Sequence, residues 1–218
     1  MFEFHCELVN FRPKIWRDFQ VRGDITLHDL ARILMTLFQM DGTHCYRMIF
    51  APKGRIKAGR LHFEPIAQRI GFGFGSSDDE EEVSNDDDDE FEVEDFYKHT
   101  LEVDDPGDID KYSLHQFLIP KGAKFFLHYD YGDDWFVAVR VKKVFVDDKL
   151  DSVNLPRVLK GEGYGIVEDA GGVWGLEELF EVSENGERSE RYLEWFQYDG
   201  PEISDFDLDD MNAKLHYS

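Results

Sequence analysis

The sequence is short of cysteine and of basic residues, and each shortage argues against a class of function. Two cysteines, Cys6 and Cys45, occur among 218 residues and do not form a C-x-x-C pair. This argues against a disulfide framework and against a thiolate zinc site. Lys and Arg number 24 against 47 Asp and Glu, which gives a formal net charge of −23. Because basic residues supply most of the affinity for phosphates, this balance argues against direct nucleic-acid binding and favours a basic partner or a metal cation.

Long apolar runs are also missing. No segment approaches the roughly 20 consecutive apolar residues that span a bilayer, and residues 1–5 lack the basic flank of a signal peptide. We therefore expect a cytoplasmic protein that makes no membrane contact. Hydrophobic residues still form 42% of the chain, and Phe alone contributes 19. That is enough apolar area for one sizeable core, so we predict a single domain over residues 1–218.

Negative charge is concentrated in one internal segment. Residues 76–95 hold 13 Asp or Glu and no Lys or Arg, so a formal charge of −10 remains on the rest of the chain. The chain also loses hydrophobic periodicity from Gly71, and we predict a mobile acidic insertion at 71–95. A solvated loop is the simplest interpretation. The more specific alternative is a DNA mimic, in which the carboxylates take the place of phosphates and bind a basic protein.

Periodicity predicts the order of the first elements. Apolar residues alternate with polar ones at 2–8 and again at 15–21, as in half-buried strands. Residues 26–40 begin with a capping box and continue with apolar residues at helical spacing. Residues 44–50 return to a strand-like pattern. We therefore predict strand, strand, helix, strand, with the helix on one face of a sheet.

A second pair of strands and several short helices are predicted further along the chain. Segments 125–131 and 135–146 are typical of two antiparallel strands joined across a turn at 132–134. The glycine-rich stretch 161–172 is too irregular for a strand or a helix, and helical spacing after it indicates short C-terminal helices. The predicted fold class is α+β, with a mixed or antiparallel sheet.

The turn between the second pair of strands is the main candidate site. It gathers carboxylates, a glycine and aromatic residues within a few positions, and a second acidic segment follows within 161–175. We interpret these two segments as the walls of a polar acidic cleft. The candidate ligand-binding residues are Asp130, Asp133, Asp134, Trp135, Glu162, Glu168 and Asp169.

The carboxylates have two interpretations, which the residues alone leave open. Asp133, Asp134, Glu168 and Asp169, together with the aspartate at 130, are candidate ligands of a hard divalent cation. In the structural alternative, which we favour, Asp133 and Asp134 cap turn amides and Trp135 packs beneath them.

Two other features are interpreted as ordinary structure. His44 and Cys45 begin a strand-like segment and have no matching Cys or His elsewhere, so we interpret them as sheet residues. The glycines near 71–75 and 161–165 lack the Lys-Ser/Thr of a phosphate-binding loop. We expect the second glycine set to shape a loop that brings Glu162, Glu168 and Asp169 near Asp130.

Several motifs together resemble a known family. The run Tyr129 to Trp135, the triplet Gly161-Glu162-Gly163 and the segment Glu168 to Gly175 resemble the plasmid Ri ORF-3-like family, and so do Lys14 to Arg17 and Thr26 to Leu30. The resemblance covers nearly the whole chain except the insertion. It implies an α+β fold and an occurrence in bacteria, archaea and mobile elements. Some members carry a transposon resolvase label, but this sequence shows no serine- or tyrosine-recombinase constellation.

We predict a binding or interaction protein more than an enzyme, with an acidic cleft for an unknown protein or small ligand and no cofactor. The alternative is a metal-dependent hydrolase or nuclease that uses the same carboxylates with a divalent cation. An acidic DNA mimic or a mobile-element accessory protein is the lesser alternative.

Overall fold

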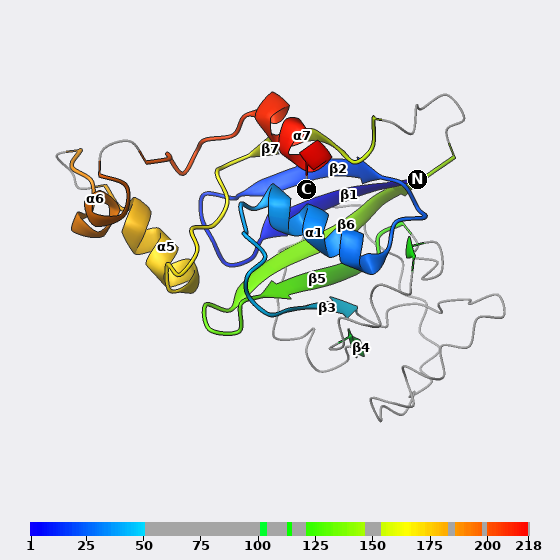
Figure 1. Cartoon of the computed structure of the whole chain (residues 1–218), viewed down its shortest axis with the longest axis horizontal. Coiled ribbons are helices and arrows are strands. Elements are labelled where there is room, and N and C mark those ends of the chain that lie inside the picture. The colour runs from blue at the N-terminus through cyan, green and yellow to red at the C-terminus, as the bar shows by residue number, and fades with distance from the viewer. Residues whose placement is uncertain are drawn as a thin grey trace.

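The protein has an α+β fold built on one antiparallel sheet (Figure 1). The computed structural model describes residues 1–50, 101–103, 113–114, 121–146, 154–182, 186–197 and 200–217. The predicted insertion at 71–95 lies outside these residues. Within them, seven strands form the sheet and four helices accompany it.

The strands follow one another in the sheet in the order β4-β3-β5-β6-β1-β2-β7, and each neighbouring pair is antiparallel. Their bounds are β1 (Phe2–Leu8), β2 (Trp16–Val21), β3 (Tyr46–Phe50), β4 (Leu101–Val103), β5 (Lys124–Tyr129), β6 (Trp135–Val144) and β7 (Arg157–Glu162). The predicted start of strand, strand, helix, strand is confirmed as β1, β2, α1 and β3. The second predicted strand pair corresponds to β5 and β6.

Strand β7 corrects the prediction that the chain is irregular from Gly161. The strand includes Gly161 and Glu162 and pairs with β2. It lies at the edge of the sheet, where Asn212 of the C-terminal helix accepts a hydrogen bond from Val158 N (2.8 Å) and donates one to Val158 O (3.3 Å). Among the described strands, β7 pairs with β2 alone, and its sequence carries little apolar alternation. The sequence pattern therefore misses it.

Helix α1 (Leu27–Leu37) begins at the predicted capping box. Thr26 Oγ1 accepts a hydrogen bond from Asp29 N (3.0 Å), and Asp29 Oδ2 accepts one from Thr26 N (2.9 Å). The helix ends before the predicted residue 40 because Gln39 adopts a left-handed backbone conformation with φ of 61°. The three C-terminal helices are α5 (Gly172–Phe180), α6 (Glu190–Phe196) and α7 (Leu208–Tyr217). None of the helices in the described ranges is long and apolar enough to cross a bilayer.

The two faces of the sheet differ in character. Helices α1 and α7 lie over one face, and α5 and α6 lie to one side (Figure 1). Alternate residues of β1, such as Phe4 and Cys6, are buried together with the apolar residues of α1. We call this larger cluster of buried apolar residues the main core. Because side chains alternate along a strand, His5 and Glu7 lie on the opposite face.

Candidate functional site

The acidic turn, defined as residues 130–135, joins β5 to β6 and is held by its own backbone. Asp134 N donates a hydrogen bond to Asp130 O (2.7 Å), and Asp130 N donates one to Cys45 O (2.9 Å). Both Asp130 and Asp134 have positive φ angles, 54° and 60°, which aspartate tolerates better than most residues. Asp130 Oδ1 accepts a hydrogen bond from Gly132 N (2.9 Å). The turn therefore holds the Oδ1 atom of Asp130, and the Oδ2 atom of the same carboxylate faces His44.

His44, which precedes β3, lies among carboxylates from two other segments, one after β5 and one before α5. Its Nδ1 atom is 3.6 Å from Asp130 Oδ2, and its Nε2 atom is 3.7 Å from both Glu168 Oε2 and Asp169 Oδ1. One ligand atom each from His44, Asp130 and Asp169 lies within 4.8 Å of the others. We call His44, Asp130, Glu168 and Asp169 the cation cluster. The imidazole also packs edge-on against the Tyr129 ring, with centroids 5.8 Å apart.

Tyr129 fixes Glu168 behind the cation cluster. Its hydroxyl lies 3.0 Å from both Glu168 Oε1 and Asp41 Oδ1 and accepts a hydrogen bond from Gly42 N (3.1 Å). Asp41 N also donates to Glu168 Oε1 (2.8 Å). Within the described part of the chain, the buried Oε2 atom of Glu168 accepts no hydrogen bond. One oxygen of Glu168 is thus anchored, and the other faces His44.

Burial and these hydrogen bonds shift the pKa values of Glu168, Tyr129 and Asp41. Burial raises the pKa of the Glu168 carboxyl, against the opposing effect of its hydrogen bonds from Asp41 and Tyr129. Burial, followed by the hydrogen bonds to Glu168 and Asp41, raises the pKa of the Tyr129 hydroxyl above its usual range. Tyr129 therefore stays neutral and serves as a hydrogen-bond donor. Hydrogen bonds from Thr43 lower the pKa of Asp41.

The other candidates in the acidic turn make contacts outside the cation cluster. Asp133 Oδ2 accepts a hydrogen bond from Gly171 N (2.9 Å), which ties the turn to the loop before α5. Asp134 Oδ1 lies 2.6 Å from His128 Nε2, and Trp135 is fully buried in the main core. These contacts hold the acidic turn against its neighbours. Asp133 and Asp134 are therefore not among the residues around His44.

The structure corrects the expectation that Glu162 joins the acidic turn. Glu162 Oε2 instead accepts a hydrogen bond from Trp16 Nε1 (3.2 Å). It ends β7 at the edge of the sheet, whereas the acidic turn follows β5, and three strands separate the two. At a strand spacing of about 4.8 Å, β5 and β7 are roughly 19 Å apart. Of the acidic residues after β7, Glu168 and Asp169 reach the turn.

The glycine-rich loop after β7 is explained by Arg17, which is fully buried. The guanidinium donates to the main-chain oxygens of Trp16, Glu162, Gly163 and Tyr164 at 2.6 to 2.9 Å. A Cβ atom at Gly161 would lie 2.6 Å from Arg17 Cδ. Gly161 therefore makes room for Arg17, whereas an added Cβ atom at Gly163 or Gly165 would meet Ile15 or Phe38. Packing accounts for all three glycines without a bound phosphate.

The interpretation of His44 as a sheet residue is corrected, because His44 precedes β3, and Asp41 and Tyr129 are not among the predicted candidate site residues. The pairing of Tyr46 with Tyr129 between β3 and β5 brings the residues before β3 beside the acidic turn. This pairing joins segments more than 80 positions apart, and no local spacing signals it. The acidic motifs do point to Asp130, Glu168 and Asp169, since all three lie in the cluster.

Comparison with known proteins agrees with the fold. The chain is 33% identical over 95 residues to the uncharacterized protein y4hQ of Sinorhizobium fredii (strain NBRC 101917 / NGR234). That match covers 42% of this chain and 47% of y4hQ, so it spans about half the length of this relative. A crystal structure of MM3350, a protein of unknown function from Methanosarcina mazei Go1, has a TM-score of 0.64 over 96% of each chain. Its sequence identity is 21%, so this likeness concerns the fold alone.

The family itself is shown by a match along almost the entire sequence. A sequence model of the plasmid pRiA4b ORF-3-like proteins matches residues 1–215. This range includes both acidic motifs and the residues of the cation cluster. The chain therefore belongs to the plasmid pRiA4b ORF-3-like family.

Proposed function

We propose that the protein binds a divalent cation through His44, Asp130 and Asp169, with Glu168 as a fourth ligand. The observation that carries this proposal is the convergence of three ligand atoms within 4.8 Å of one another. They come from three segments, which precede β3, follow β5 and precede α5. The three ligand atoms are therefore close together because of the fold, and not because their residues are neighbours in the sequence.

The donor set indicates which cations suit the cluster. One imidazole nitrogen with several carboxylate oxygens fits Zn²⁺ or Mn²⁺ better than it fits a thiolate-seeking ion. The anchors described above hold Asp130 and Glu168 before any ion arrives. This lowers the entropy lost when the cluster closes around a cation. The negative charge of the chain, −23, also raises the local concentration of cations.

The test is titration of the full-length protein with Mn²⁺ or Zn²⁺ by calorimetry at physiological salt. We expect one tight equivalent in the wild type, which is lost in His44→Gln and in Asp169→Asn. We expect the 13 acidic residues of segment 76–95 to bind cations weakly as well, but this segment is the same in every variant and does not affect the comparison. A cation at 100 times its Kd also raises the free energy of unfolding by about 2.7 kcal/mol.

The matched control is Glu177→Gln, which removes one negative charge from an exposed position of α5 outside the cluster. We expect this variant to keep the tight equivalent. If all three variants bind with the wild-type stoichiometry and affinity, the cation is held elsewhere and the proposal is wrong.

Metal-dependent hydrolysis is the second candidate function. Three protein ligands are typical of catalytic zinc sites, which use the next coordination position for a reactive water. His44, Asp130 and Asp169 supply this number in the arrangement in which Glu168 does not coordinate the cation. Hydrolysis of a nitrophenyl phosphate diester by the cation-loaded protein would support it, provided that His44→Gln abolishes the rate. A rate that stays the same in His44→Gln would exclude this cluster as its source.

A further inference from the structure

A second charged region lies on the sheet face opposite α1 and does not involve the cation cluster. Carboxylates of β1 and β2 form its inner layer, and they belong to Glu3, Glu7 and Asp18. Basic side chains from the neighbouring segments form its outer layer. We call Lys14, Lys142, Lys143, Arg157 and Lys160 the basic sheet face.

The two layers differ in exposure. The side chains of Glu3, Glu7 and Asp18 are 2% to 8% exposed. The four lysines that pair with them are 30% to 64% exposed. A partner that approaches this face therefore meets ammonium groups before it meets carboxylates.

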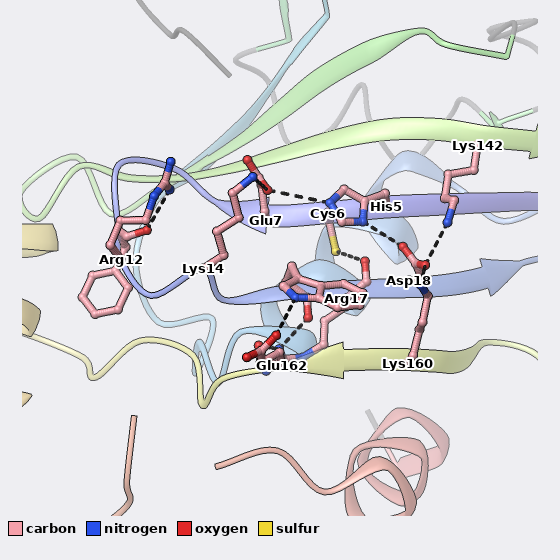
Figure 2. A network of polar contacts seen from close by, with 12 residues as sticks. His5, Cys6, Glu7, Arg12, Lys14, Arg17, Asp18, Lys142, Lys160 and Glu162 are labelled. Atoms are coloured by element: carbon pink, nitrogen blue, oxygen red, sulfur yellow. Dashed lines mark hydrogen bonds and ion pairs between the residues drawn. The ribbon is translucent and has the colours of Figure 1, made fainter. Parts of the chain in front are cut away.

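Asp18 organises the centre of this region (Figure 2). Its Oδ2 atom lies 2.9 Å from Lys142 Nζ and 3.3 Å from Lys160 Nζ, and its Oδ1 atom lies 2.8 Å from His5 Nδ1. The two lysines come from β6 and β7, on opposite sides of β1 and β2. One carboxylate thus holds two ammonium groups side by side, and it neutralises the charge of only one of them.

The remaining contacts keep the outer layer in place. Lys14 Nζ lies 3.4 Å from Glu7 Oε2, and Lys143 Nζ lies 3.5 Å from Glu3 Oε2. Lys160 Nζ also lies 5.1 Å from the centre of the Trp16 ring, which favours a cation over the ring. Fixed lysines lose less side-chain entropy on binding than free ones do.

The net charge of this region is positive, whereas the net charge of the whole chain is negative. Four lysines pair with three carboxylates, and Arg157 lies beside them and donates to Gln20 Oε1, within a protein whose net charge is −23. Arg140 and Glu162 also lie toward this face and carry opposite charges, so they do not alter the balance. A local positive surface on an acidic protein favours an anionic partner of matching size.

We propose that the basic sheet face binds a short acidic polypeptide segment of a partner protein. The face spans the four strands β6, β1, β2 and β7, a width of roughly 14 to 19 Å, which an extended segment of about five residues covers. A long nucleic acid would extend past the face, and the negative charge of the rest of the chain repels it there. Carboxylates on a short segment meet the lysines alone.

The test uses the full-length protein and a fluorescent decapeptide rich in glutamate, followed by anisotropy at low and physiological salt. We expect saturable binding that weakens with salt. Lys160→Gln and Lys143→Gln should each weaken binding about three- to fivefold, as expected for exposed charge pairs. Lys214→Gln, which changes an exposed lysine of α7, should bind as the wild type does. Thermal unfolding of each variant separates lost contacts from lost folding.

Three results would overturn the proposal. The first is equal affinity in the wild type and in both face variants. The second is tighter binding of a single-stranded oligonucleotide of the same charge, which would assign the face to a nucleic acid. The third is a marked preference for a peptide with the sequence of residues 76–95, which would assign the face to the acidic segment of this chain.

Discussion

At the scale of single residues, Arg17 sets the shape of the loop after β7. Burial lowers the pKa of its guanidinium to about 10, and its charge meets main-chain oxygens and the rings of Phe38 and Phe206. We predict that Arg17→Met lowers the free energy of unfolding by about 3 kcal/mol or more, because several buried carbonyl groups lose their donor. Urea unfolding measures this loss. Arg22→Met, at an exposed arginine, should keep the wild-type midpoint, and equal midpoints for both variants would contradict the role of Arg17.

His5 and Asp18 give the stability of the fold a predictable pH dependence. Burial opposes the charged form of both groups, but their mutual hydrogen bond and the neighbouring Glu7 and Lys142 raise the pKa of His5 and lower that of Asp18. The contribution of His5 is complete below its usual pKa of about 6.5 and is lost as the pH rises through the raised value. The contribution of Asp18 is present above about 3.9 and is lost as the pH falls through the lowered value.

We therefore expect the urea midpoint of the wild type to fall as the pH rises above about 6.5, because the raised pKa of His5 lies above this value. This fall should be smaller in His5→Asn, because asparagine has no imidazole to lose a proton beside Asp18. His216→Asn, at an exposed histidine of α7, is the matched control and should keep the full decrease. Parallel pH profiles for the wild type and His5→Asn would show that the pair does not couple to folding.

At the scale of elements, α1 depends on its capping box. We predict that Thr26→Ala lowers the free energy of unfolding by about 1 kcal/mol, because the amide of Asp29 loses its acceptor. Thr26→Ser keeps the hydroxyl and should recover most of the loss. Thr36→Ala, within the same helix, removes a hydroxyl that only bonds back to Arg32 O and should cost less. Chemical denaturation of the three variants ranks them, and a larger effect at Thr36 would contradict the capping role.

The elements also show how much of the fold the sequence predicts. Strong alternation and a capping box predict β1, β2, β5, β6 and α1, because each buries one regular face in the core. The pattern in β7 is weak because this edge strand pairs on one side and ends around Arg17. Of the cation cluster, the sequence predicts Asp130, Glu168 and Asp169 from the acidic motifs. It does not predict His44, because the pairing of β3 with β5 that places His44 there joins distant segments of the chain.

At the scale of the whole molecule, two charged regions of different character share one sheet. The cation cluster gathers carboxylates beside the acidic turn after β5, and the basic sheet face gathers lysines over β1, β2, β6 and β7. The cation cluster lies at the ends of β3 and β5, and the basic sheet face covers the four strands that follow them in the sheet order. Salt screens exposed charges over about 8 Å at physiological strength. Ionic strength should therefore affect the lysines more than it affects Asp130 and Glu168, whose side chains are 11% and 20% exposed.

The contact between Asn212 and Val158 has a consequence for self-association. An exposed edge strand offers free amide and carbonyl groups to a strand of another molecule. Here the side-chain amide of Asn212 occupies both the donor and the acceptor of Val158, as a neighbouring strand would. Helix α7 therefore covers part of the β7 edge, and covering an edge with a helix is one way in which proteins disfavour pairing with a strand of another molecule.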